Sequence, residues 1–301
     1  MYNFFAIILI TVISLLPSTP KTNDWETIFR NKIDKNQAKT YEAEKNDYKP
    51  IPESVDEFKL LSSSAKAAYF VDINSGKVLY EKNGNQKLPP ASTVKLMTAI
   101  ITVTNTKLNS IITIKPQNTQ LNDSTMGLVY GDRITVKELL HGLLINSGSD
   151  ASLNLATHIS GSEISFVKIM NQKAKIFGLE NTNFTNPVGW DEAENYSTAK
   201  DLTILAKIAL QNDLIKEIVS KNNHISRSEN GNFYYLKNTN LTLGSEGYFG
   251  IKTGTTYNAG ENFIVYYKDE SREIIGTVLN STARFEETKK IIEWTKGNYS
   301  W

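Results

Sequence analysis

Five serines in the chain are followed by a lysine three positions later, a spacing that places both side chains on one face of a helix. A neutral lysine one helical turn from a serine can take its hydroxyl proton and so create a nucleophile. The spacing alone is weak evidence, because a capping serine followed by a surface lysine looks the same. The five serines are Ser18, Ser63, Ser92, Ser165 and Ser197.

Ser92 has the sequence context that a reactive serine requires. Ser92-Thr-Val-Lys95 follows a stiff Pro-Pro-Ala entry and opens the apolar run Leu96–Ile101, which predicts a helix from Ser92 to Thr106. The serine then lies at the positive end of the helix dipole. The other four serines lie in an apolar N-terminal segment, a polar lead-in to a strand, a helix interior and a helix start without a closely following apolar face. We therefore select Ser92 and Lys95.

Two further motifs follow in the chain. Ser147-Gly-Ser149-Asp150 lies in a turn after the apolar helix that Thr135-Val-Lys-Glu138 opens as a capping box. Lys252-Thr-Gly254 occurs on a predicted strand, where a glycine lets a substrate backbone lie close to the strand edge. The β-lactamases and penicillin-binding proteins carry the motifs Ser-x-x-Lys, Ser-Asp-Asn and Lys-Thr-Gly in this chain order. Three such motifs in the correct order are far more specific evidence than any one of them.

From Ala65 to Thr295 the sequence resembles the low-molecular-mass penicillin-binding proteins with D-alanyl-D-alanine carboxypeptidase or endopeptidase activity. The resemblance implies an α/β (α+β) fold of the β-lactamase/transpeptidase type, with an antiparallel sheet flanked by helices and a mostly helical subdomain inserted between N- and C-terminal strands. The predicted elements agree with this fold: a hairpin that turns at Asn74-Ser-Gly, then helices, one of them capped by Thr198, then three strands between Tyr248 and Asn280 and a final helix over Phe285–Lys296. The stretches that carry the resemblance are Pro89–Thr98, Leu143–Ser152, Phe166–Ala174, Asn183–Asp191, Tyr196–Leu202 and Gly250–Thr256.

The resemblance also implies catalytic roles. Ser92 would be the nucleophile and Lys95 its general base, while Ser147 would relay protons to the leaving amine. Lys252 would keep the site electropositive, which favours a neutral Lys95 and attracts an anionic C-terminus. No metal ion or cofactor is expected.

A second group of residues would bind the substrate. The Lys252-Thr253-Gly254-Thr255 strand and Arg284 would hold the terminal carboxylate, and the backbone N–H groups of Ser92 and Thr255 would form an oxyanion hole. Ser149 stands where the family usually has asparagine, and its shorter hydroxyl would position the substrate amide less well. Asp150 is expected to cap the next helix.

Composition excludes several classes of function. The chain has no cysteine, and its net charge of +1 from 33 Lys+Arg against 32 Asp+Glu predicts no nucleic-acid partner. The three histidines, His141, His158 and His224, show no metal-ligand spacing and are expected to be structural or solvated.

The chain is predicted to have three parts. Residues 1–20 carry no charge, and the apolar run 4–16 is shorter than the ~20 residues of a spanning helix, so it reads as a signal peptide or N-terminal membrane anchor. Residues 21–60 read as a polar linker and 61–301 as the catalytic domain. The protein is therefore expected outside the cytoplasmic membrane, exported or tethered at its outer face.

The preferred function is a serine-type carboxypeptidase that acts on peptidoglycan stem peptides ending in D-Ala-D-Ala, with β-lactam antibiotics as covalent inhibitors. A D,D-endopeptidase stays open, because after Arg284 the sequence leaves no room for the extra C-terminal β-domain of many carboxypeptidases. A β-lactamase is less favoured, since the chain shows no convincing glutamate to activate water. Because Ser149 replaces the usual asparagine, a catalytically impaired protein that only binds the cell wall stays open as a further alternative.

Overall fold

The computed structural model describes residues 51–55, 61–120 and 123–301, and these lie in one compact unit. The predicted signal peptide or anchor and most of the predicted linker lie outside the described residues. One short strand, β1 (Glu53–Ser54), falls inside the range assigned to the linker, yet it pairs antiparallel with β11 (Tyr299–Ser300). Among the described residues, none of the helices combines the length and apolar character needed to cross a membrane.

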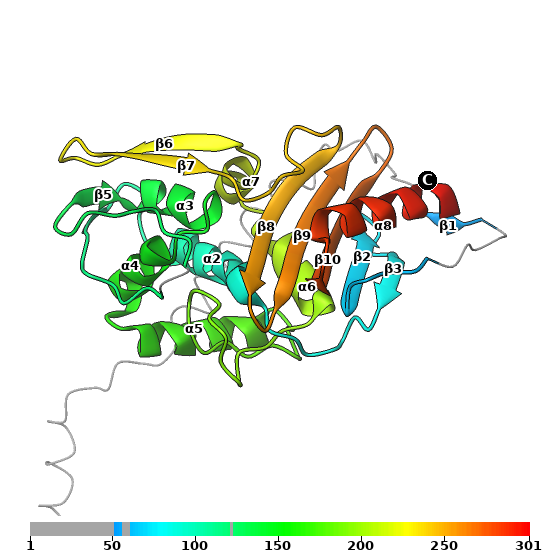
Figure 1. Ribbon diagram of the computed structural model, residues 1–301, viewed down its shortest axis with the longest axis horizontal. Coiled ribbons are helices and arrows are strands. Elements are labelled where there is room, and N and C mark those ends of the chain that lie inside the picture. Colours follow the sequence, from blue (N-terminus) through cyan, green and yellow to red (C-terminus); the bar gives the residue numbers. More distant parts are fainter. Residues whose placement is uncertain (1–50, 56–60, 121–122) are drawn as a thin grey trace, which may run out of the picture. The chain divides into compact units, whose positions relative to one another are not determined.

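The centre of the unit is an antiparallel five-stranded sheet in the order β3-β2-β10-β9-β8 (Figure 1). The N-terminal hairpin β2–β3 turns at Asn74-Ser-Gly, as predicted, and the C-terminal strands complete the sheet. The central strands are buried on both faces because helices cover both. The bounds are β2 (Ala67–Asp72), β3 (Val78–Lys82), β8 (Tyr248–Thr256), β9 (Gly260–Lys268) and β10 (Glu273–Ser281).

The two faces of the sheet belong to separate apolar clusters. On one face, helix α8 (Arg284–Asn298) buries Ile291 against Phe70 and Phe263. On the other, Ile264, Ile275 and their neighbours join the larger core formed with α2 (Lys95–Asn105) and α6 (Ala199–Ala209). Figure 1 shows α8 and α6 on opposite sides of the strands. The predicted fold class is therefore confirmed.

The segment between the hairpin and the C-terminal strands is mostly helical. Thr135 and Thr198 cap their helices by accepting hydrogen bonds from Glu138 N and Asp201 N, as predicted. Helix α7 and the β6–β7 hairpin were not predicted from the sequence. The remaining bounds are α3 (Val136–Leu144), α4 (Ser149–Ser160), α5 (Glu163–Ile176), α7 (Asp213–Val219), β4 (Ile111–Thr113), β5 (Arg133–Thr135), β6 (Asn223–Arg227) and β7 (Phe233–Lys237).

Candidate active site

Ser92 lies in a short 3₁₀ helix, η2 (Ala91–Val94), that runs directly into α2. Lys95 is the first residue of α2, and the three-residue repeat of a 3₁₀ turn places it over Ser92. The Lys95 Nζ lies 2.9 Å from the Ser92 Oγ and donates a second hydrogen bond of 2.8 Å to the Val188 carbonyl. The two residues selected from the sequence therefore meet, although the turn that carries the serine is 3₁₀ rather than α-helical.

The environment of Lys95 favours the neutral amine. The side chain is 1% exposed, and this burial lowers its pKa from 10.5 to about 7, although the carboxylates of Asp123 and Asp150 act in the opposite direction. Near pH 7 a large fraction of the amine is thus unprotonated. A neutral amine at hydrogen-bond distance from a serine hydroxyl can accept its proton.

The loop Asn186–Trp190 fixes the second partner of Lys95. Gly189 has φ +95°, and a Cβ at this position would lie 1.9 Å from the Ala91 carbonyl oxygen, so only glycine fits. The Asn186 Oδ1 accepts hydrogen bonds from Gly189 N (2.7 Å) and Trp190 N (3.0 Å). This arrangement holds the Val188 carbonyl against Lys95. This stretch carries part of the family resemblance, but no role was predicted for it from the sequence. Its Asn-Pro-Val-Gly-Trp pattern is the sequence feature that could have indicated one.

Strand β8, at the edge of the sheet, packs Gly254 against the backbone of Ser92. A Cβ on Gly254 would lie 3.0 Å from Ser92 N and 3.0 Å from the Ala91 Cβ. The close contact between β8 and η2 thus disfavours a larger residue here, a reason that differs from the close approach of substrate expected from the sequence. Lys252 is 1% exposed, and its Nζ donates to the Thr253 carbonyl at 3.0 Å.

The charge on Lys252 is weaker than expected from the resemblance. Burial lowers the pKa of Lys252 well below its ordinary value, and the nearby charges of Lys95 and Arg284 lower it further. A proton on Lys95 therefore disfavours a proton on Lys252. Arg284, whose guanidinium stays protonated in proteins, is the permanent cation of this group.

Arg284 begins α8 and reaches the β8 strand. Its Nη1 donates to the Thr255 Oγ1 at 2.6 Å and to the Gly254 carbonyl at 3.0 Å. The Thr253 Oγ1 lies 2.5 Å from the Thr239 Oγ1, a partner that the sequence analysis missed because no motif marks it. The predicted carboxylate-binding residues thus lie together along β8.

The two serines of the second motif lie close to the turn between α3 and α4, Ser147 within the turn and Ser149 just after it. Ser147 has a left-handed backbone, φ +64°, which costs ~1–3 kcal/mol in a residue other than glycine and is typical of functional sites. Its Oγ is buried and has no hydrogen-bond partner within the part of the chain that the structure describes. Ser149 begins α4, is 2% exposed and donates its backbone N–H to the Ser124 carbonyl at 2.8 Å.

Asp150 is not the N-cap residue of α4, which is Gly148, but its carboxylate does bind the first turn of that helix, where the Oδ1 accepts the backbone N–H of Ala151 at 2.9 Å. The same carboxylate also accepts the backbone N–H groups of a neighbouring loop, at 2.7, 2.9 and 3.0 Å, and so anchors that loop to the start of α4. The three donors are Met126, Gly127 and Leu128.

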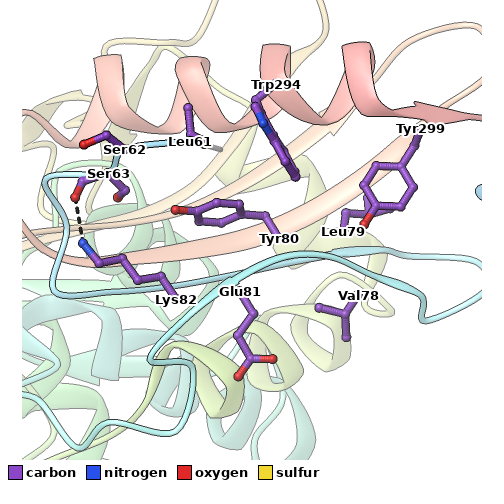
Figure 2. Close-up of a pocket in the computed structure, with 10 residues that line it drawn as sticks. All are labelled: Leu61, Ser62, Ser63, Val78, Leu79, Tyr80, Glu81, Lys82, Trp294 and Tyr299. Atoms are coloured by element: carbon purple, nitrogen blue, oxygen red, sulfur yellow. Dashed lines mark hydrogen bonds between the residues drawn. The ribbon is translucent and has the colours of Figure 1, made fainter. Parts of the chain in front are cut away.

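An apolar groove of about 630 Å³ lies away from these residues, between β3 and the C-terminal part of α8 (Figure 2). Tyr80, Trp294 and Tyr299 line it, and so does Ser63. None of the site residues expected from the sequence lines this groove. The groove is therefore separate from the candidate site.

Comparisons with known proteins agree with one another. A family model described as D-alanyl-D-alanine carboxypeptidase matches residues 54–283. The carboxypeptidases DacF of Bacillus subtilis and DacC of Escherichia coli are 35% and 34% identical to this chain, over 77% of it and 61% of each relative. The chain thus spans about three fifths of their length. The crystal structure of the Streptomyces K15 DD-transpeptidase has a TM-score of 0.75 and 30% identity, covering 79% of this chain and 99% of that one.

Proposed function

This chain belongs to the D-alanyl-D-alanine carboxypeptidase family, and from that premise we propose that it removes the terminal D-alanine of peptidoglycan stem peptides through an acyl-enzyme on Ser92. The observation that carries the proposal is the buried Lys95 amine, with a pKa of about 7, at 2.9 Å from the Ser92 Oγ. A hydroxyl beside such a base becomes a nucleophile at neutral pH.

In the acylation step the Ser92 Oγ attacks the carbonyl carbon of the penultimate D-alanine while its proton passes to Lys95. The N–H groups of Ser92 and Thr255 stabilise the oxyanion, and each such donor contributes roughly 3–4 kcal/mol. The peptide C–N bond then breaks, and the departing amine takes a proton through Ser147. The buried and unpartnered Ser147 Oγ supports this relay.

The terminal carboxylate of the substrate binds along β8. Arg284 already lies on Thr255 and Gly254, and a carboxylate is the ligand that a guanidinium binds best. Arrival of the anion also raises the pKa of Lys252, because an opposite charge favours the protonated amine. Water then hydrolyses the ester and restores Ser92.

Labelling with penicillin tests the proposal. The full-length chain, incubated with the antibiotic, should gain the mass of one penicilloyl group, and peptide mapping should place it on Ser92. Ser92→Ala should abolish the adduct, whereas Ser165→Ala, which removes the serine of another Ser-x-x-Lys motif in α5, should leave it unchanged. Wild-type protein that never gains this mass would overturn the proposal.

Purified muropeptides separate the related activities. Loss of one alanine from pentapeptide monomers assigns a carboxypeptidase, and cleavage of cross-linked dimers assigns an endopeptidase. Rapid turnover of penicillin without a lasting adduct would assign a β-lactamase. Muropeptide binding without acylation would assign a wall-binding protein, the outcome that Ser149 in place of asparagine motivates.

The same proposal includes a location outside the cytoplasmic membrane, by export or by a tether through residues 4–16. The apolar run at these positions supports it, as does the location of peptidoglycan. Fusion of residues 1–60 to a reporter that folds only after export should give an active reporter. The mass of the exported N-terminus then distinguishes a cleaved signal from a retained anchor.

A further inference from the structure

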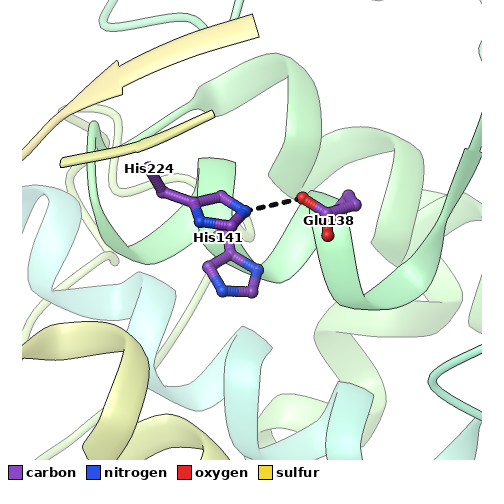
Figure 3. A group of neighbouring side chains, drawn as sticks. All are labelled: Glu138, His141 and His224. Atoms are coloured by element: carbon purple, nitrogen blue, oxygen red, sulfur yellow. Dashed lines mark hydrogen bonds and ion pairs between the residues drawn. The ribbon is translucent and has the colours of Figure 1, made fainter. Parts of the chain in front are cut away.

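Helix α3 and strand β6 bring three potential metal ligands together, away from Ser92. Glu138 and His141 lie one turn apart on α3, and His224 projects toward them from β6 (Figure 3). One ligand atom from each of the three residues can be chosen so that all lie within 4.8 Å of one another. The sequence hid this group, because the third ligand comes from a distant hairpin.

His141 is oriented as metal-binding imidazoles usually are. Its Nδ1 lies 2.9 Å from the Lys137 carbonyl oxygen, and since a carbonyl only accepts, the Nδ1 carries the hydrogen. The Nε2 is therefore the nitrogen that carries the lone pair and can bind a metal ion. A backbone carbonyl that fixes the tautomer in this way is a common partner of a ligating histidine.

Glu138 and His224 form the open side of the group. The His224 Nε2 lies 2.8 Å from the Glu138 Oε2, and the two side chains are 23% and 22% exposed, so solvent reaches them. A metal ion can take the place of the proton shared by these atoms. The two imidazole rings are stacked, with centroids 3.8 Å apart, so binding requires His224 to turn out of the stack. Its position on a partly exposed hairpin strand allows that rotation.

We propose that Glu138, His141 and His224 bind one divalent transition-metal ion of the Zn²⁺ type. Two imidazoles and one carboxylate are a ligand set that Zn²⁺ accepts, with water at the fourth position. The ion would join α3 to the β6–β7 hairpin. It would act on the stability of the fold and take no part in the chemistry at Ser92.

A substitution at Lys221 should strengthen metal binding, whereas substitutions of the ligands should weaken it. Its Nζ lies 3.4 Å from the His141 Nε2 and 2.7 Å from the Glu217 Oε1. The ammonium thus competes for the lone pair that the metal needs. Lys221→Met removes this competitor and should tighten binding about threefold, the value of a long and therefore weak hydrogen bond.

The experiment uses the full-length chain without a polyhistidine tag, titrated with Co²⁺ as a spectroscopic probe and then with Zn²⁺. We expect visible absorption of a four-coordinate Co²⁺ at one ion per chain, lost when Zn²⁺ displaces it. Excess Zn²⁺ should raise Tm by about 5 °C. Glu138→Gln and His224→Gln should weaken binding about 100-fold or more. His158→Gln, which removes the exposed third histidine on α4, should change nothing.

Equal Co²⁺ binding by wild-type protein and His224→Gln would overturn the proposal, and so would wild-type protein that gives no absorption. Tm values measured in chelator establish that each variant is folded, independently of any activity at Ser92. The gain expected for Lys221→Met cannot arise from misfolding, so it tests the site even if a ligand variant unfolds.

Discussion

The two faces of the central sheet differ in the polar groups that are buried beside their apolar cores. Under α8 the contacts are apolar and aromatic, as in the edge-to-face pair of Phe263 and Phe285 with ring centroids 5.1 Å apart. On the side of η2 and α2, the sheet and its neighbours bury the amines of Lys95 and Lys252 and the hydroxyl of Ser147. Buried amines destabilise a fold unless they are paired. Both faces thus bury apolar side chains that stabilise the fold, and the side of η2 and α2 also holds the groups on which the proposed reaction depends.

The largest expected effect comes from Lys95→Met, which keeps the volume and removes the base. Acylation by penicillin should slow about 10³-fold, since a positioned general base contributes 10²–10⁴. Tm should change little, because the relieved desolvation of the amine offsets the lost hydrogen bond to Val188. Stopped-flow acylation and thermal melting measure the two effects. A large fall in Tm would show that Lys95 also stabilises the fold.

Ile291→Ala should have the opposite profile. It opens a cavity under α8 and should lower the free energy of unfolding by about 3 kcal/mol, measured in urea. The acylation rate at 25 °C should stay at the wild-type value. Lys289→Ala, an exposed position of the same helix, serves as the control and should alter neither quantity. Slower acylation by Ile291→Ala would contradict the separation of the two faces.

The pH dependence of acylation should follow the Lys95 amine. Below a pH of about 7 the rate should rise about tenfold per unit, and above it the rate should level off, because only the neutral amine accepts the Ser92 proton. Stability should respond too. Between about 7 and 10.5 the unfolded chain holds a proton on Lys95 that the folded chain lacks, so this group makes the fold more stable as pH rises. Lys95→Met should lose this contribution to stability.

The smallest expected effect belongs to Ser149→Asn, which restores the residue usual in the family. One added hydrogen bond to the substrate amide, worth about 1 kcal/mol, should raise kcat/KM on a D-Ala-D-Ala peptide about fivefold. Unchanged kcat/KM would mean that Ser149 positions substrate as well as asparagine does.

Local signals predicted most of the fold. The hairpin turn at Asn74-Ser-Gly, the caps at Thr135 and Thr198 and the helix that Arg284 begins depend on neighbouring residues, so the sequence reveals them. The Pro-Pro-Ala entry likewise selected Ser92 from five similar serines. The short β6–β7 hairpin was missed because its strands carry weak patterns.

The rest depends on contacts between distant segments. The Val188 carbonyl that binds Lys95 is a backbone group and leaves no side-chain signal. Thr239 and the partners of His141 become visible when separate elements pack together. Asp150 shows a different difficulty. A carboxylate near the start of a helix can accept backbone N–H groups from that helix or from a neighbouring loop, and the sequence does not say which.

Gly189 limits how the sequence around Ser92 can vary. The loop touches the Ala91 carbonyl with main-chain atoms, so the nucleophile's position is set by a residue that has no side chain to vary. Saturation mutagenesis at this position should return glycine alone among active clones. Variants of the proposed enzyme that resist β-lactams should therefore keep Gly189 and carry their substitutions at other positions.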